Sequence, residues 1–132
     1  WLGDGCMIVA VEQSACIAFA LELEHRSAEV CAPLALRVGI ATGHALLFEG
    51  DDYIGSAVNM ASRLCDAAGP FEVLLPTMQI ERLPEGVVTA VHGDLELRGF
   101  PGPISVVELS GQPKMASSTD TAELWTRSPF LA

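Results

Sequence analysis

A helix is predicted most clearly by the stretch GSAVNMASRLCDAAGP, residues 55–70. Ser56 is a residue type that caps helix N-termini, and the Gly69-Pro70 pair stops a helix. The helix expected between them, Gly55–Ala68, is amphipathic. Its apolar face consists of residues at helical spacing, namely Val58, Ala61, Leu64 and Cys65. A helix of this kind packs one face on a sheet and leaves the other for solvent or ligand.

Asn59 and Arg63 are four residues apart on this helix, so their side chains project together, away from the apolar face. An amide donor beside a fixed cation suits a site where negative charge develops, as in phosphoryl chemistry. From spacing alone, a solvated helix face is the commoner explanation of such a pair.

Strands and helices alternate over residues 1–109. A second helix is expected from Ser14 to about His25, and a short one over Thr77–Leu83. Expected strands are Cys6–Val11, Leu34–Ala41, Ala45–Phe48, Glu72–Leu75, Val87–Val91, Leu95–Arg98 and Ile104–Leu109. The alternation favours an α/β or α+β domain with one sheet. The Ser-, Thr-, Pro- and Gly-containing remainder, 110–132, is predicted to be a mobile tail.

Composition and charge exclude several classes of protein. The chain has 132 residues, of which 50% are hydrophobic and 18% charged, so it can bury a core and is not intrinsically disordered. Its net charge of −10 disfavours nucleic acid and anionic membranes as partners. No uncharged apolar run approaches the roughly 20 residues of a membrane-spanning helix. The cysteines lack a Cys-x-x-Cys pair, which disfavours zinc and favours buried free thiols in a reducing cytoplasm: Cys6, Cys16, Cys31 and Cys65.

Three further positions carry groups suited to nucleotide chemistry. Asp4 lies at the tip of a Gly-Asp-Gly turn, where an exposed carboxylate can approach Mg²⁺ or simply serve the turn. Arg37 interrupts an apolar strand, where its charge needs a partner, either a buried acid or a phosphate. The Asp51-Asp52 pair is suited to accepting hydrogen bonds from a base amino group, and is equally typical of a solvated acidic loop.

Four stretches in a fixed order carry a family resemblance: WLGDGCMIV, LRVGIATGHAL, GDDYIGSAVNMASRLCDAAGP, and GDLELRG followed by PISVVEL. Over about Trp1–Leu109 the chain resembles the catalytic domain of the class III adenylate/guanylate cyclases. The resemblance implies an α+β fold, a ferredoxin-like βαββαβ sandwich, here without its first strand and helix. The family's first metal-binding aspartate and its purine-selecting lysine are then expected upstream of Trp1.

The resemblance also implies an activity. The ribose 3′-hydroxyl of ATP, rather than GTP, would attack the α-phosphorus, releasing pyrophosphate and forming 3′,5′-cyclic AMP. The active sites are expected at a homodimer interface, with two Mg²⁺ or Mn²⁺ ions per site, and the domain itself would contact no membrane. The alternative is a catalytically inactive cyclase-like module that binds nucleotide, or only dimerises, and regulates a partner domain.

Three residues are implied to face the metal ions and phosphates. Asp4 matches the second of the family's two metal-binding aspartates. Arg37 matches a basic residue that contacts the triphosphate. Arg98, in LELRG, stands where the family usually has a lysine that reaches the terminal phosphates.

Three others are implied to face the nucleoside and the reacting phosphorus. Asp52 aligns with the acidic residue that accepts the adenine amino group. Asn59 and Arg63 match the pair that positions the ribose and stabilises the pentavalent transition state. The resemblance thus assigns the exposed face of the predicted helix to catalysis.

Overall fold

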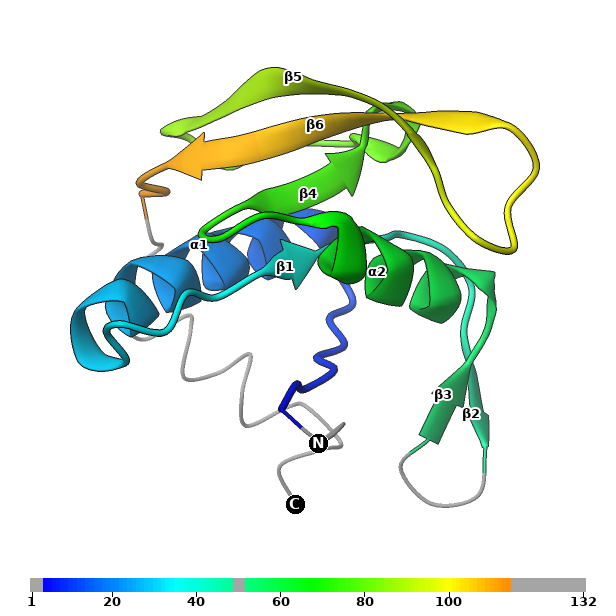
Figure 1. Ribbon diagram of the computed structural model, residues 1–132, viewed down its shortest axis with the longest axis horizontal. Coiled ribbons are helices and arrows are strands. Elements are labelled where there is room, and N and C mark those ends of the chain that lie inside the picture. The colour runs from blue at the N-terminus through cyan, green and yellow to red at the C-terminus, as the bar shows by residue number, and fades with distance from the viewer. Residues whose placement is uncertain (1–3, 49–51, 115–132) are drawn as a thin grey trace.

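The computed structural model describes residues 4–48 and 52–114 and has an α+β architecture (Figure 1). The helices are α1 (Gln13–Val30) and α2 (Ser56–Ala67), with a 3-10 turn η1 at Thr77–Gln79. The strands are β1 (Val38–Gly39), β2 (Leu46–Phe48), β3 (Asp52–Ile54), β4 (Val73–Pro76), β5 (Val87–Glu96) and β6 (Pro103–Gly111). The predicted α+β class is therefore confirmed.

The main sheet has four strands in the order β1-β4-β6-β5, while β2 and β3 form a separate antiparallel hairpin. β1 runs parallel to β4, and the β4–β6 and β5–β6 pairs are antiparallel. The sheet is therefore mixed, with its parallel pair at one edge.

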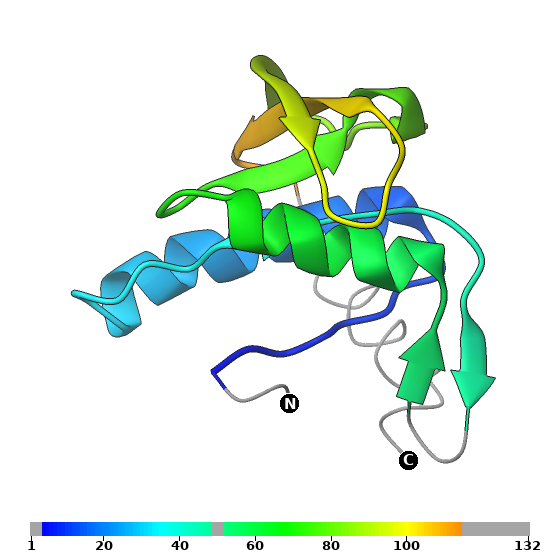
Figure 2. The same ribbon diagram turned by 45° about the vertical axis from the view of Figure 1, so that its right-hand side comes forward.

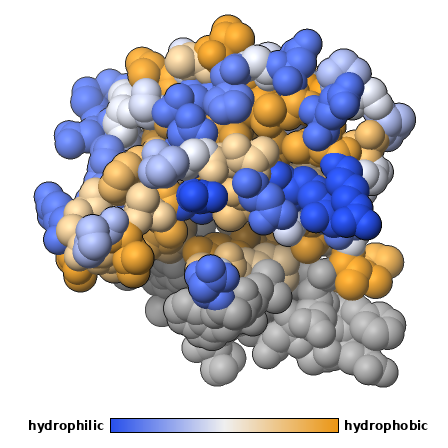
Figure 3. Space-filling model, in the orientation of Figure 1, coloured by the Kyte–Doolittle hydropathy of each residue, from blue (hydrophilic) through white to orange (hydrophobic). Residues whose placement is uncertain are grey.

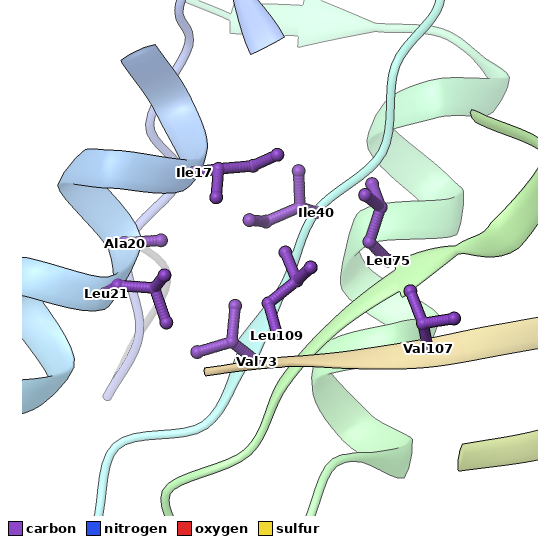
Figure 4. Packing of buried hydrophobic residues seen from close by; sticks show 8 residues of the cluster. All are labelled: Ile17, Ala20, Leu21, Ile40, Val73, Leu75, Val107 and Leu109. Carbon is purple, nitrogen blue, oxygen red and sulfur yellow. The ribbon is translucent and has the colours of Figure 1, made fainter. Parts of the chain in front are cut away.

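The two helices cover opposite faces of this sheet. On β4, Val73 and Leu75 belong to the cluster packed on α1, whereas Leu74 belongs to the cluster packed on α2. This alternation follows from the two-residue period of a strand. Figure 4 shows the α1 side, where Ile17 and Leu21 point toward the sheet.

α2 lies unusually close to β1 because Gly39 has no side chain. A Cβ atom built on Gly39 would lie 2.5 Å from the Cys65 backbone nitrogen and 2.8 Å from the Leu64 Cβ. The helix itself differs from expectation at its start. Gly55 occupies the N-cap position, and Ser56 is the first helical residue and makes no capping hydrogen bond. The predicted cap at Ser56 is thus wrong, although the helix it was to begin is present.

The predicted strand Cys6–Val11 is wrong. Residues 6–10 have no regular structure, and apolar side chains along the segment are exposed, with Val11 fully so. In Figure 2 the segment runs apart from the sheet toward α1. A strand needs a neighbour for its backbone hydrogen bonds, and no strand of residues 4–48 and 52–114 pairs with this segment.

Other predicted elements differ mainly in length. The expected strand Leu34–Ala41 reduces to β1, whose two residues pair only with β4. The two strands expected over 87–98 form one strand, β5, interrupted by a register shift between Val91 and Gly93. The expected short helix over 77–83 contracts to η1, and the helix expected over 14–25 continues to Val30.

The C-terminal boundary is also refined. β6 includes Ser110 and Gly111, which the sequence assigned to the tail. Lys114 donates its backbone N–H to the Glu85 carbonyl at 2.9 Å. Residues 115–132 of the predicted tail lie outside the described residues. Within the described part, no helix combines the length and apolar character needed to cross a membrane.

Candidate functional site

The outer face of α2 carries the predicted catalytic pair. Asn59 is exposed and Arg63 is half-buried, whereas Leu64 on the opposite face is fully buried against the sheet. The Arg63 guanidinium lies 3.7 Å from the Asp66 carboxylate, one turn further along the helix. Hydrophilic side chains cover the surface over this helix (Figure 3). The structure thus presents an amide and a guanidinium side by side to solvent.

Arg98 lies in the connection between β5 and β6, and its side chain is exposed. The preceding residue, Leu97, is buried in the cluster that includes Leu64, with Met60 packed against it. Met60 and Leu64 directly follow Asn59 and Arg63 in the sequence. The connection therefore packs on α2 close to the predicted catalytic pair, and Figure 2 shows it passing in front of the helix.

Arg37 does not lie inside a strand. It is exposed and precedes β1, so the expectation that its charge needed a buried partner is wrong. Its main chain contacts α2 instead, because the Arg37 carbonyl accepts a hydrogen bond from the Cys65 thiol at 3.3 Å. Its side chain is exposed to solvent.

Asp4 is exposed in a turn. Burial is the main reason that the pKa of Cys65 is raised, and the negative charges of Asp66 and Asp4 raise it further while Arg37 lowers it. The Asp4 carboxylate is therefore within electrostatic reach of Cys65. An exposed carboxylate fits Mg²⁺, which binds one or two carboxylates together with substrate phosphates. Residues 4–48 and 52–114 contain no group of three or more metal-ligating side chains.

The predicted site residues fall on two sides of α2. At about 100° per residue, Cys65 points roughly 160° away from Arg63 around the helix axis. The Arg37 carbonyl contacts Cys65 and the Asp4 charge acts on it, whereas Asn59 and Arg63 project from another side of the helix. The Arg37 main chain therefore meets α2 on a different side from Asn59 and Arg63.

Asp52 is the first residue of β3 and pairs in register with Phe48 of β2. The hairpin leads through Gly55 directly into α2, which connects this position to the helix of the predicted catalytic pair. The side chain of Asp52 lies outside the described residues, so its predicted contact with adenine stays a prediction.

All four cysteines are free, as expected, but Cys6 and Cys31 are exposed rather than buried. Burial raises the pKa of the Cys16 and Cys65 thiols. Since the thiolate is the nucleophile, a raised pKa leaves less of it at a given pH. At pH 8, iodoacetamide should therefore modify the two exposed cysteines before the other two, as followed by peptide mass spectrometry. Equal labelling rates for Cys65 and Cys6 would contradict this packing.

Sequence reasoning missed two glutamines that connect the elements around the site. Gln13 is the first residue of α1 and is buried, so its amide needs hydrogen-bond partners. Polar residues flank it on both sides, Glu12 and Ser14, so its local sequence does not indicate that burial. Gln79, in η1, bonds both to the loop after β1 and to α2. Their partners lie far away in sequence and therefore left no local pattern.

A mixed sheet with α1 and α2 on opposite faces gives the chain a cyclase-like fold. Solved structures agree on the fold. The adenylyl cyclase CyaB from P. aeruginosa matches with a TM-score of 0.60 and 22% identity, over 76% of this chain and 60% of that one. An adenylate cyclase from Trypanosoma brucei, studied in its monomeric state, matches with a TM-score of 0.51 and 25% identity, over 82% and 59%. The resemblance to class III cyclases predicted from sequence is thereby confirmed at the level of the fold.

Curated relatives come from mycobacteria. The uncharacterized protein Rv2212 of Mycobacterium tuberculosis and Mb2235 of Mycobacterium bovis are each 35% identical over 121 residues, 92% of this chain. A second uncharacterized M. tuberculosis protein, Rv1359, is 37% identical over 67 residues, 51% of this chain. The chain spans 31% of the length of the first two and 26% of the third. No protein-family model matches the chain.

Proposed function

We propose that this domain is an adenylyl cyclase that converts ATP to 3′,5′-cyclic AMP and pyrophosphate at a homodimer interface. The observation that carries the proposal is the Asn59–Arg63 pair on the exposed face of α2, within a cyclase fold. One fold hosts many activities, so the fold does not identify the reaction. An amide and a guanidinium at this spacing are suited to stabilising the negative charge that develops in phosphoryl transfer.

In the proposed reaction, the ribose 3′-hydroxyl loses its proton to water, and its oxygen forms a bond to the α-phosphorus as the bond from that phosphorus to the pyrophosphate oxygen breaks. Negative charge then spreads over the phosphoryl oxygens and the leaving group. Arg63 neutralises that charge with a planar set of N–H donors, and Asn59 orients the ribose by hydrogen bonding. Because the rest of the chain is strongly acidic, each arginine at the site offsets a field that would otherwise repel ATP.

The remaining predicted residues hold the substrate. Arg37 and Arg98 are exposed guanidinium groups suited to the triphosphate. Asp52 would accept the adenine amino group, which favours ATP because guanine has a carbonyl at that position. Asp4 would contribute a carboxylate to Mg²⁺ or Mn²⁺, two ions per site, which when bound would lower the pKa of the 3′-hydroxyl and neutralise charge on the pyrophosphate.

The placement of these residues on two sides of α2 supports a site shared between two copies. Asp4 and Arg37 of one copy would complete a site with Asn59, Arg63 and Arg98 of the other. A two-fold axis would generate two such sites, because each copy offers the same two surfaces.

The test is product formation from ATP or GTP with Mn²⁺, measured by mass spectrometry at several protein concentrations. Cyclic AMP should form, at a rate that rises more steeply than linearly with protein concentration while dimers are still forming. Cyclic GMP in equal or greater amount would contradict the assignment of Asp52. If neither product forms but ATP raises the melting temperature, the chain is a nucleotide-binding module instead.

A further inference from the structure

Two glutamine side chains form a hydrogen-bonded network beneath the candidate site. Gln13 is only 8% exposed. Its amide nitrogen donates to the Thr42 hydroxyl at 2.7 Å and to the Gln79 carbonyl at 2.5 Å. Its amide oxygen accepts from the Glu81 backbone N–H at 2.8 Å. Both ends of this buried amide are therefore satisfied.

Gln79 extends the network toward α2. Its amide oxygen accepts from the Thr42 backbone N–H at 2.8 Å, and its amide nitrogen lies 3.4 Å from the Met60 sulfur, a weak acceptor. Thr42 is thus bound twice, once by each glutamine. Met60 is the residue that follows Asn59 on α2.

The network joins four segments that are distant in sequence: the start of α1, the loop between β1 and β2, the stretch 79–81, and α2. Its hydrogen bonds span 19 to 68 positions. Apolar packing tolerates small sliding of one element past another, but hydrogen bonds have a narrow range of distance and angle. The hydrogen bonds of the Gln79 amide therefore add a directional connection between α2 and the β1–β2 loop to the apolar packing of the helix.

We propose that Gln79 is a positioning residue that holds the Asn59–Arg63 face of α2 in register with the β1–β2 loop. The inference rests on the proposed function for its catalytic consequence. Gln79 touches no substrate in this scheme. It acts through Met60 on one side and Thr42 on the other, so that loss of its amide leaves the Thr42 N–H without its acceptor and removes the hydrogen bond between η1 and α2.

The test compares Gln79→Leu with Gln112→Leu, a change of the same chemistry at an exposed glutamine outside the network. The first readout is NMR of the full chain, with ¹³C-methyl methionine and backbone ¹⁵N labels. Gln79→Leu should shift the Met60 methyl signal and shift or broaden the amide signals of Thr42, Asn59 and Arg63. Gln112→Leu should leave all four unchanged.

The second readout is steady-state kinetics with ATP, well below the melting temperature of each variant. Gln79→Leu should lower kcat about tenfold and change KM less than twofold, because small displacements of a catalytic group affect the chemical step most. Met60→Leu, which keeps the side-chain volume but removes the sulfur, should shift the same amides and lower kcat by a smaller factor. If Gln79→Leu does not fold, Met60→Leu still tests whether the Gln79–Met60 contact positions α2.

The outcomes separate this inference from the proposed function. Unchanged amide signals at Asn59 and Arg63 in Gln79→Leu would overturn the positioning role whatever the activity. Equal losses of kcat in Gln79→Leu and Gln112→Leu would overturn it too. A wild-type chain that makes no cyclic nucleotide would refute the proposed function alone, and the NMR comparison would still decide the placement of α2.

Discussion

Replacing Arg63 with alanine should lower the rate of cyclic AMP formation by about 10²–10³ while the protein stays folded. The guanidinium is half-buried on the outer face of α2, where it contributes nothing to the core. Its ion pair with Asp66 at 3.7 Å is a surface interaction, of the kind worth about 0.2–1 kcal/mol. Turnover with ATP and Mn²⁺, together with thermal unfolding, measures both effects.

A matched control comes from α1. Arg26 is also a helix-surface arginine, and it pairs with Glu22 at 2.6 Å, but it lies outside the candidate site. Arg26→Ala should leave turnover within about twofold of wild type. If both alanine variants lose activity equally, or if Arg63→Ala retains it, the assignment of the α2 face to catalysis fails.

Gly39→Ala is expected to destabilise the fold by about 3 kcal/mol, near the upper end of the usual cost of overpacking. The new methyl group would meet backbone atoms of α2, at the Ala61 carbonyl and the Cys65 nitrogen, and these cannot rotate away. The helix would have to move off β1. Thermal or urea unfolding measures the loss, which corresponds to a fall in Tm of about 10 °C.

Gly69→Ala is the control for this substitution. A Cβ at Gly69 would meet the Glu72 carboxylate at 3.2 Å, the end of a flexible side chain that can shift at the cost of weakening its hydrogen bond from the Gly69 N–H at 2.6 Å. It should therefore cost much less than Gly39→Ala. If the two variants lose the same amount of stability, the close approach of α2 to β1 does not explain the need for glycine at position 39. Since Gly39→Ala displaces α2, it should reduce activity as well.

Local sequence patterns predicted helix α2 well. Most of the wrong predictions concern strands, whose formation depends on pairing with residues far away in the sequence. The apolar spacing of Val58, Ala61 and Leu64 is sufficient to place Asn59 and Arg63 outside, because a helix satisfies its own backbone. The segment Cys6–Val11 has an equally apolar composition, but a strand depends on a neighbour that its own residues do not specify.

Arg37 illustrates the same difference. Apolar residues surround it in the sequence, and a strand over the whole stretch would place a charge among them. The pairing with β4 instead begins at Val38, so Arg37 precedes the strand and its side chain reaches solvent. The glutamine network was missed for a related reason, since the residues that satisfy Gln13 are 29 to 68 positions away.

The apolar segment that precedes α1 favours aggregation, and aggregation would change the concentration dependence of any assay of this chain. Met7, Ile8 and Val9 are 37%, 44% and 41% exposed on a backbone without regular structure. Exposed apolar chain without regular structure can pair with strands of other molecules, and such pairing leads to aggregation. A rate that rises steeply with protein concentration must therefore be accompanied by light scattering, so that a two-copy active species is distinguished from larger aggregates. Replacing Ile8 with lysine should suppress the aggregates, because a charge in the segment opposes such pairing, and leave the dimer-dependent rate in place.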